Sequence, residues 1–139
     1  MKVICKKDTL VQAVTNVSRA VSNKSTIPAL EGILLQTTQN GLYIAGYDLN
    51  LGITTEIEAR VEEPGGAVLS AKFFSDATRR MPADEIMITC DEKQLTQISS
   101  GSSQFTVLSI SAADYPELPA IPKDQVLTLE KELLRNMID

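Results

Sequence analysis

The 139-residue chain contains no histidine. Histidine is the commonest general base and metal ligand in proteins, so its absence excludes every Ser-His and Cys-His catalytic arrangement from this sequence. The glycine-rich phosphate loop is also missing, because Pro64-Gly65-Gly66 reads as a tight turn without the GxxxxGKS or GxxxxGKT pattern. Four acids lie in loop-like sequence: Asp48, Asp84, Asp114 and Glu117. Loop acids more often form turns than bind metals, so we expect neither a metal site nor a cofactor.

Cysteine is scarce. Cys5 and Cys90 are far apart in the sequence, each lies in a strand-like apolar run, and no Cys-x-x-Cys spacing occurs. This pattern predicts two reduced, buried thiols rather than a disulfide or a metal site. No apolar run is long enough to span a bilayer, and the opening residues MKVICKK are too short and too charged for a secretory signal. We therefore expect a cytoplasmic protein without a membrane partner.

A strand-then-helix unit recurs along the chain. Residues 3–14 (VICKKDTLVQAV) are echoed by residues 126–138 (VLTLEKELLRNMI), and a weaker copy runs from GAVLSA at Gly66 into KFFSDATRRM. Repeated units indicate a modular architecture. The last copy has no helix stop signal after it, and the proline-rich residues 116–122 read as a linker. We expect a domain over residues 1–118, a linker over 119–125 and the truncated start of a second domain over 126–139.

Hydrophobic periodicity predicts two helices within the first domain. Asp8 is expected to cap a helix over residues 9–21, and a second helix over residues 71–81 ends before Pro82. Strand patterns cover residues 33–37, 42–47, 51–61, 67–70, 85–90, 94–99 and 104–110. Residues 51–61 alternate apolar and polar side chains, which predicts one buried face and one solvated, largely acidic face. The sequence thus predicts an α+β fold in which a strand, a helix and three strands occur twice, with both helices packed on antiparallel sheets.

Positive charge is concentrated in the helical segments of an acidic chain. Residues 9–30 hold two basic residues and no acid, whereas residues 70–82 hold three basic residues and one acid, Asp76, which can pair with Arg80 one turn later. Each segment carries a net charge of +2, which leaves −9 for the rest of a chain whose total is −5. The side chains expected to point to solvent from this side are Gln12, Asn16, Arg19, Lys24, Lys72, Arg79 and Arg80.

Two interpretations of this charge pattern remain open. Helix faces are often basic simply because they are solvated. Alternatively, the mixture of cations and amide donors binds phosphates, and the absence of an exposed aromatic residue for stacking on unpaired bases favours duplex DNA over single strands.

Four segments together resemble one protein family. In chain order they are KDTLVQAVTNVSRAVSNKSTIPALEGILL, GAVLSAKFFSDATRRMP, SGSSQF and AADYPELP. They are similar to the amino-terminal domain of the bacterial DNA sliding clamp, the beta subunit of DNA polymerase III. The resemblance implies the DNA clamp fold and a homodimeric, head-to-tail ring of three-domain protomers around double-stranded DNA. It implies a processivity factor that tethers the polymerase without catalysing any reaction.

The resemblance also suggests roles for individual residues. Lys24 matches a basic position after the first helix where family members touch DNA, Lys72 precedes the matching aromatic pair, and Arg79 and Arg80 match the basic end of that helix. Some members carry two basic residues before the aromatic pair, where this chain has Ala71-Lys72. Gln12, Asn16 and Arg19 are predicted to contact DNA only because their side chains are expected to face the same side as these cations.

A second set of residues matches the ring-closing edge of the family. In the strand SQFTVLSI, Phe105 and Val107 would pack against the other protomer, with Ala77 nearby on the second helix; an ordinary core role for Phe105 remains open. The family pocket for the polymerase catalytic subunit and the clamp loader lies between later domains, outside this chain.

Two other function classes remain open at this point. A protein-interaction scaffold that does not bind DNA could use the same repeated units. An enzyme could use loop acids such as Asp48 and Asp114 with a metal.

Overall fold

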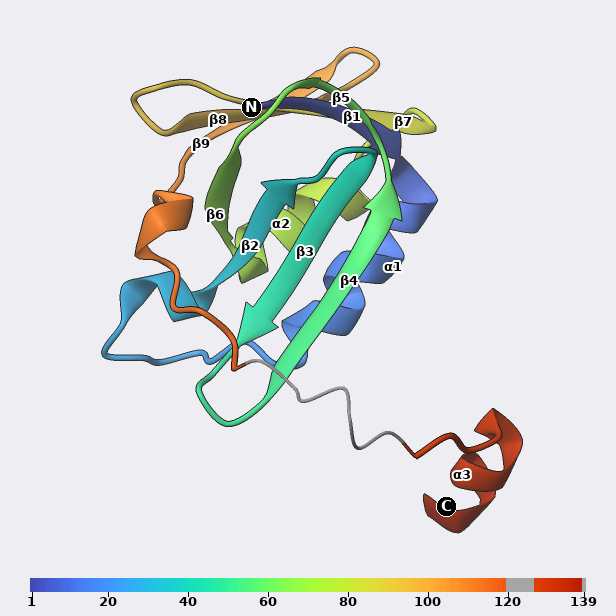
Figure 1. Cartoon of the computed structure of the whole chain (residues 1–139). Coiled ribbons are helices and arrows are strands. Elements are labelled where there is room, and N and C mark those ends of the chain that lie inside the picture. Colours follow the sequence, from blue (N-terminus) through green and yellow to red (C-terminus); the bar gives the residue numbers. More distant parts are fainter. Residues whose placement is uncertain (120–126, 139) are drawn as a thin grey trace.

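The structure, a computed structural model, describes residues 1–119 and 127–138 of the chain (Figure 1). Its strands are β1 (Lys2–Lys6), β2 (Gly32–Thr37), β3 (Gly41–Tyr47), β4 (Gly52–Glu58), β5 (Arg60–Glu63), β6 (Gly66–Ser70), β7 (Glu85–Cys90), β8 (Leu95–Ser100) and β9 (Ser103–Leu108). Its helices are α1 (Lys7–Ser18), α2 (Ala71–Arg79), α3 (Lys131–Ile138) and the short 3₁₀ turns η1 (Pro28–Glu31) and η2 (Ala112–Asp114).

The strands form two antiparallel sheets. The five-stranded sheet has the order β5-β1-β7-β8-β9, and the four-stranded sheet has the order β4-β3-β2-β6. The predicted order of a strand, a helix and three strands is confirmed twice, as β1-α1-β2-β3-β4 and β6-α2-β7-β8-β9. The leading strand of each unit joins the sheet of the other unit, since β1 pairs with β7 and β6 pairs with β2. The two units therefore form one fold, in agreement with the predicted α+β class.

Two local predictions are wrong. The single strand expected over residues 51–61 is divided at Ala59, because β4 pairs with β3 in one sheet whereas β5 pairs with β1 in the other. The apolar alternation continues through the break, so the sequence pattern gives no sign of it. Asp8 does not cap α1, which begins at Lys7 after an extended Lys6 that provides no side-chain cap. Asp8 lies instead in the first turn, where a negative charge favours the helix dipole.

The main core lies between the helices and the two sheets. Its members include Leu10, Val14 and Val17 on α1, which recur at helical spacing, and Phe74 on α2. The sheets contribute the side chains Val3, Ile33, Leu35, Leu42, Ile44, Leu69, Ile86, Ile88 and Ile98, each less than 2% exposed. The burial of apolar side chains is the dominant stabilising contribution to a domain, at roughly 25 cal/mol per Å² of apolar surface.

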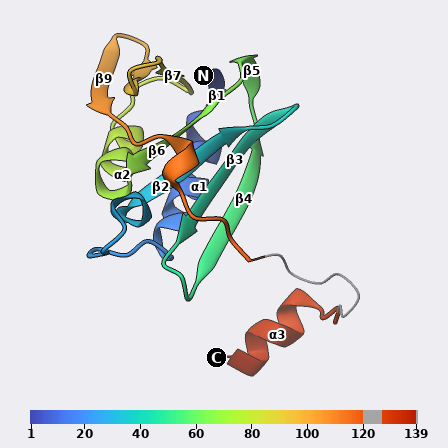
Figure 2. The same ribbon diagram turned by 60° about the vertical axis from the view of Figure 1, so that its left-hand side comes forward.

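A second, smaller core covers the opposite face of the four-stranded sheet. Residues 109–118, which we name the strap, follow β9 and cross this face (Figures 1 and 2). The strap is joined to β6 by backbone hydrogen bonds of 2.8 and 2.9 Å between Val68 and Ile110. Tyr115 then packs with Leu30, Tyr47 and Val68.

The third copy of the unit is only partly present in the described residues. The predicted helix is confirmed as α3, whose side chains are all exposed, whereas Leu127–Glu130 form no strand. The linker predicted over residues 119–125 falls almost wholly outside the described residues, as does Val126. Within the described residues, no helix is long and apolar enough to cross a membrane.

Helix α1 approaches the four-stranded sheet closely at Gly46 on β3. A Cβ atom at this position would overlap the backbone carbonyl of Val17, so only glycine fits between helix and strand. We expect Gly46→Ala to destabilise the fold by about 1–3 kcal/mol, as overpacking of a core does. Urea denaturation followed by circular dichroism measures this loss.

Gly52→Ala provides the matched control for that substitution. Its Cβ would meet the end of the Leu118 side chain at 2.8 Å, which can rotate away. We expect a cost below about 1 kcal/mol. Equal losses for the two variants would contradict the close approach at Gly46.

The two cysteines lie in different environments. Cys5 is buried and 3% exposed, whereas Cys90 is half-buried, with its Sγ atom 3.6 Å from the Ser109 hydroxyl. Burial, with a smaller contribution from the charge of Glu85, raises the pKa of the Cys5 thiol to about 12. Cys5 and Cys90 are not joined by a disulfide in the structure, and the predicted burial is confirmed for Cys5 alone.

These environments predict two thiol reactivities. At pH 8 we expect Cys90 to react readily with Ellman's reagent and Cys5 to react only as the chain unfolds, because the reagent requires an exposed thiolate. The unfolded thiol ionises near pH 9.0 and the folded thiol near pH 12, so the contribution of Cys5 to stability should fall as pH rises between these values. The Cys90→Ser variant isolates the slow thiol. Two equal rates in the native chain would contradict the assignment.

Candidate nucleic-acid interface

Helices α1 and α2 lie side by side and antiparallel on one side of the molecule. The Lys7 ammonium, at the start of α1, donates to the Met81 carbonyl beyond the end of α2 at 2.7 Å. Further along, the hydroxyls of Ser18 and Ser75 are 3.3 Å apart. The order of these contacts along the two helices fixes their opposite directions.

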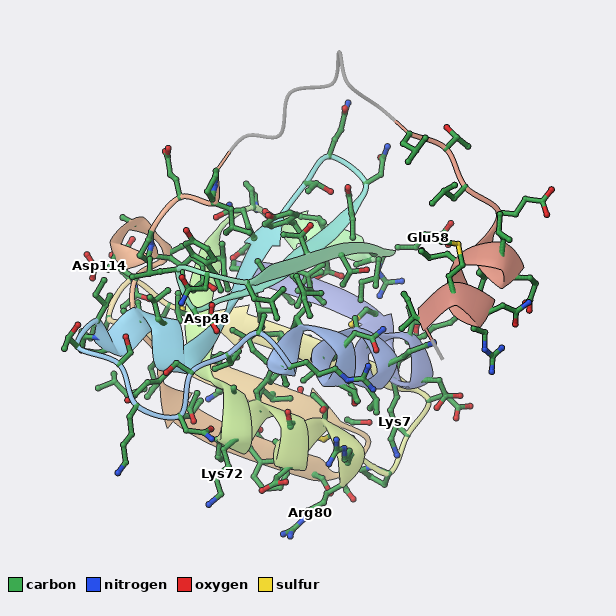
Figure 3. The ribbon with its side chains drawn as sticks, turned by 90° about the horizontal axis from the view of Figure 1, so that it is seen from below. Lys7, Asp48, Glu58, Lys72, Arg80 and Asp114 are labelled. Atoms are coloured by element: carbon green, nitrogen blue, oxygen red, sulfur yellow. The ribbon has the colours of Figure 1, made fainter. Side chains whose placement is uncertain are left out.

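All seven side chains predicted to contact phosphates are exposed on or beside these two helices. They are Gln12 and Asn16 on α1, Arg19 just after it, Lys24 in the next loop, Lys72 and Arg79 on α2, and Arg80 at its C-cap. We name this set the helix face. Figure 3 looks at the helices and shows Lys72 and Arg80 extending outward from α2. The helix face therefore brings together residues from two distant parts of the sequence.

The positive charge of α2 is concentrated at its C-terminal end. Arg79 lies in the last turn and Arg80 at the C-cap, where the helix dipole favours cations. Arg79 also donates to the Thr15 hydroxyl across the helix pair at 3.5 Å, a long contact that leaves most of its donors available.

The ion pair predicted between Asp76 and Arg80 is not formed. Among the described residues, the ion pairs are Lys2 with Glu62 and Arg60 with Glu62, both away from the helices. Asp76 and Arg80 both line a small hollow beside Phe105 of β9 without forming an ion pair. Among the described residues, no cation of the helix face therefore forms an ion pair with an acid.

One of the loop acids, Asp48, has a structural role. Asp48 accepts hydrogen bonds from the backbone N–H groups of Leu51 and Asn50 at 2.6 and 2.9 Å, which lower the pKa of its carboxyl. This closes the β3–β4 turn, in which Leu49 has a left-handed φ of 77°. Asp114 occupies η2 on the strap. In Figure 3 the labelled acids Asp48 and Asp114 lie apart from Lys72 and Arg80.

The ring-closing residues predicted from the sequence gather at β9. This strand is the end of the five-stranded sheet, so one side of its backbone has no partner strand among the described residues. Phe105 and Val107 are half-buried and pack against the border of the main core, whereas Ala77 on α2 is buried. The Phe105 ring meets Phe73 edge-on, with 6.1 Å between the ring centroids.

The same strand borders a hollow that sequence reasoning missed. It measures about 180 Å³ and is lined by Phe73, Asp76, Ala77, Arg80 and Phe105. The family resemblance suggested that Ala77 lies near Phe105, but no sequence pattern indicates that β9 and α2 enclose a hollow between them. The structure thus brings Arg80 to the helix face and to the β9 edge at once.

The family follows from the sequence profile that the chain matches. Residues 1–119 match the profile described as DNA polymerase III beta subunit, N-terminal domain. The chain belongs to this family. The beta sliding clamp of Bacillus subtilis (strain 168) is 34% identical over 146 aligned residues, which cover 99% of this chain and 39% of that protein. The beta sliding clamp of Synechococcus elongatus is 35% identical over 137 residues, which cover 96% and 36%.

Solved structures of beta subunits and sliding clamps share the fold. The DNA polymerase sliding clamp from Bacillus subtilis superimposes with a TM-score of 0.95 at 34% identity, over 99% of this chain and 38% of that one. The beta subunit of the DNA polymerase of Streptococcus pyogenes superimposes with a TM-score of 0.92 at 25% identity, over the same shares. The expected DNA clamp fold is therefore confirmed. The chain spans less than two fifths of the length of these relatives.

Proposed function

We propose that the chain is the amino-terminal domain of a sliding clamp, the processivity factor of the bacterial replicative DNA polymerase III. The observation that carries this proposal is the helix face. In a chain that is acidic overall, positive charge is concentrated on two adjacent helices, and the rest of the chain, including the sheets on which they pack, is acidic. A fold-wide basic surface would favour general binding of nucleic acid. Positive charge restricted to the helix face favours a protein that contacts the duplex with that side only.

The mechanism needs weak contacts with phosphates rather than tight binding. A closed ring retains DNA by topology, so the helix face has only to screen the phosphates while the ring moves along them. The tethered polymerase then meets the primer end at a high effective concentration. No bond is made or broken in this mechanism, so the domain acts as a non-catalytic accessory subunit without a cofactor. Its place of action in this proposal is the cytoplasm.

Ring closure is assigned to the β9 edge. The unpaired backbone of β9 would extend its sheet with a strand of a second protomer, and Phe105, Val107 and Ala77 would pack beneath that junction. An edge strand with apolar neighbours is a favourable surface for this pairing and a hazard when left uncovered. The hollow beside Phe105 supports the assignment, since it offers space for an incoming side chain.

The division of the chain is part of the same proposal. Residues 1–118 form the first domain, residues 119–125 the linker and residues 126–139 the start of the second domain. The exposed apolar side chains Leu133, Leu134, Met137 and Ile138 of α3 support this reading, because an amphipathic helix needs a core to cover it. The polymerase catalytic subunit and the clamp loader would bind in later domains.

The first test neutralises the helix face. We expect the variant Lys24→Ala with Arg79→Ala and Arg80→Ala to weaken binding to a short duplex at low ionic strength. The slope of log K against log salt should become shallower by up to about three, since each phosphate contact contributes about 0.9. Fluorescence anisotropy over a salt series measures the slope, and thermal unfolding should change little because all three side chains are exposed.

A charge-matched control separates site from net charge. The variant Arg60→Ala with Lys93→Ala and Lys131→Ala removes the same charge from exposed positions on β5, in the β7–β8 turn and on α3, outside α1 and α2. We expect it to keep most of the salt slope. Equal salt slopes for the two triple variants would contradict the helix face as the DNA-binding site and would favour a scaffold that does not bind DNA.

The second test asks whether the full-length protein holds DNA by topology. It is loaded by its clamp loader with ATP onto nicked circular DNA, and retention is measured before and after the circle is cut once. We expect the protein to be retained on the circle and lost after cutting, because a ring slides off free ends. Equal retention on the linear product would mean ordinary binding and would exclude the clamp mechanism.

A further inference from the structure

The strap encloses a groove on the face of the four-stranded sheet that points away from the helices. The groove measures about 480 Å³, within the range of ligand pockets in proteins. We name it the strap groove. Its floor is formed by Leu34 on β2 and Tyr43 on β3, and its wall by the strap residues Tyr115, Glu117 and Leu118. Figure 2 shows the strap passing over β2.

The wall of the groove is held in place by contacts on both sides. At one end the strap pairs with β6 through Val68 and Ile110, and the Ser111 hydroxyl accepts from the Ala113 N–H at 3.3 Å to cap η2. At the other end Leu118 lies over Gly52 on β4. A groove that is already formed costs a ligand little ordering free energy.

The chemistry of the lining suits a cation with an apolar stem. Glu117 provides a carboxylate beside the half-buried ring of Tyr43, and Leu34 and Leu118 provide aliphatic surface. The Tyr115 hydroxyl does not contribute, because it is fully buried, and burial with the nearby Tyr43 and Tyr47 raises its pKa to about 12. A carboxylate pairs with guanidinium through two charge-assisted hydrogen bonds, and a tyrosine ring attracts a cation to its face.

The charge around the groove has one sign. The strands β2, β3 and β4 with their turns, together with the strap, carry five acids and no lysine or arginine. The acids are Asp48, Glu56, Glu58, Asp114 and Glu117. This charge repels nucleic acid and attracts basic peptides. The strap groove is thus complementary in charge to a different class of ligand from the helix face.

We propose that the strap groove binds a peptide segment of a partner protein, with an arginine side chain paired to Glu117 and flanked by apolar residues on Leu34 and Leu118. The inference goes beyond the proposed function and does not depend on it. Since the groove and the helix face lie on opposite faces of the same sheet, a partner could occupy the groove while the helices face a duplex.

The experiment uses the 139-residue chain and a fluorescein-labelled probe peptide with the sequence Gly-Ser-Leu-Arg-Leu-Ser-Gly. We expect saturable binding by anisotropy, with amide shifts in the ¹⁵N spectrum confined to the strap and to β2 and β3. Glu117 is exposed, so solvent screens its charge, and Glu117→Gln should weaken binding roughly three- to tenfold. The spectrum of the free variant shows that the fold is retained.

Glu92→Gln is the matched control, because it removes the same charge from an exposed position in the β7–β8 turn, outside the groove. We expect it to change the affinity less than twofold. A probe with glutamate in place of arginine should not bind. The proposal is overturned by an absence of saturable binding, by equal effects of the two variants, by shifts centred on other elements, or by undiminished binding of the glutamate probe.

Discussion

One shared hydrophobic core determines most features of this domain. The apolar sides of α1 and α2 meet the inner faces of both sheets in a single cluster, so the polar sides of the helices must point away from the sheets in the same direction. Helix α1 lies so close to β3 that the backbone of Val17 rests on Gly46. Basic residues about fifty positions apart in the sequence therefore share one surface. The helix face is a consequence of packing rather than of any local motif.

The sequence contained the elements and lacked the information on how they join. Strict helical spacing on α1 and the alternation in β4 reflect burial on one side, which any sequence with those elements must show. The division at Ala59 could not be predicted, because the chain changes sheets there while the side chains keep their alternation. The pair of Asp76 with Arg80 failed for a related reason. Helical spacing permits that pair but does not determine the side-chain conformations that would form it.

The candidate site was predicted as a set of exposed residues on one side of the molecule, but the contacts around it were not predicted. Charge segregation could be counted directly, whereas the proximity of Arg80 to Phe105 and the groove beneath the strap depend on contacts between distant segments. The two faces of the four-stranded sheet also differ in chemistry. One is covered by cationic helices, and the other by an acidic strap with aromatic residues below it. The four-stranded sheet thus keeps two surfaces for different kinds of ligand apart, because they lie on its opposite faces.

The exchange of leading strands has a consequence for how the domain forms. β1 is the first strand to be synthesised, yet one of its neighbours, β7, begins at Glu85 and the other, β5, begins at Arg60. Contacts between such distant segments are slow to form, and neither unit can complete a sheet alone. During synthesis α1 can pack on β3 and β4 of its own unit, but β1 has no complete sheet to join until β7 has left the ribosome. The order of strands that joins the two units so firmly therefore leaves the edges of β1 unpaired for longer in the growing chain, and unpaired strand edges favour aggregation.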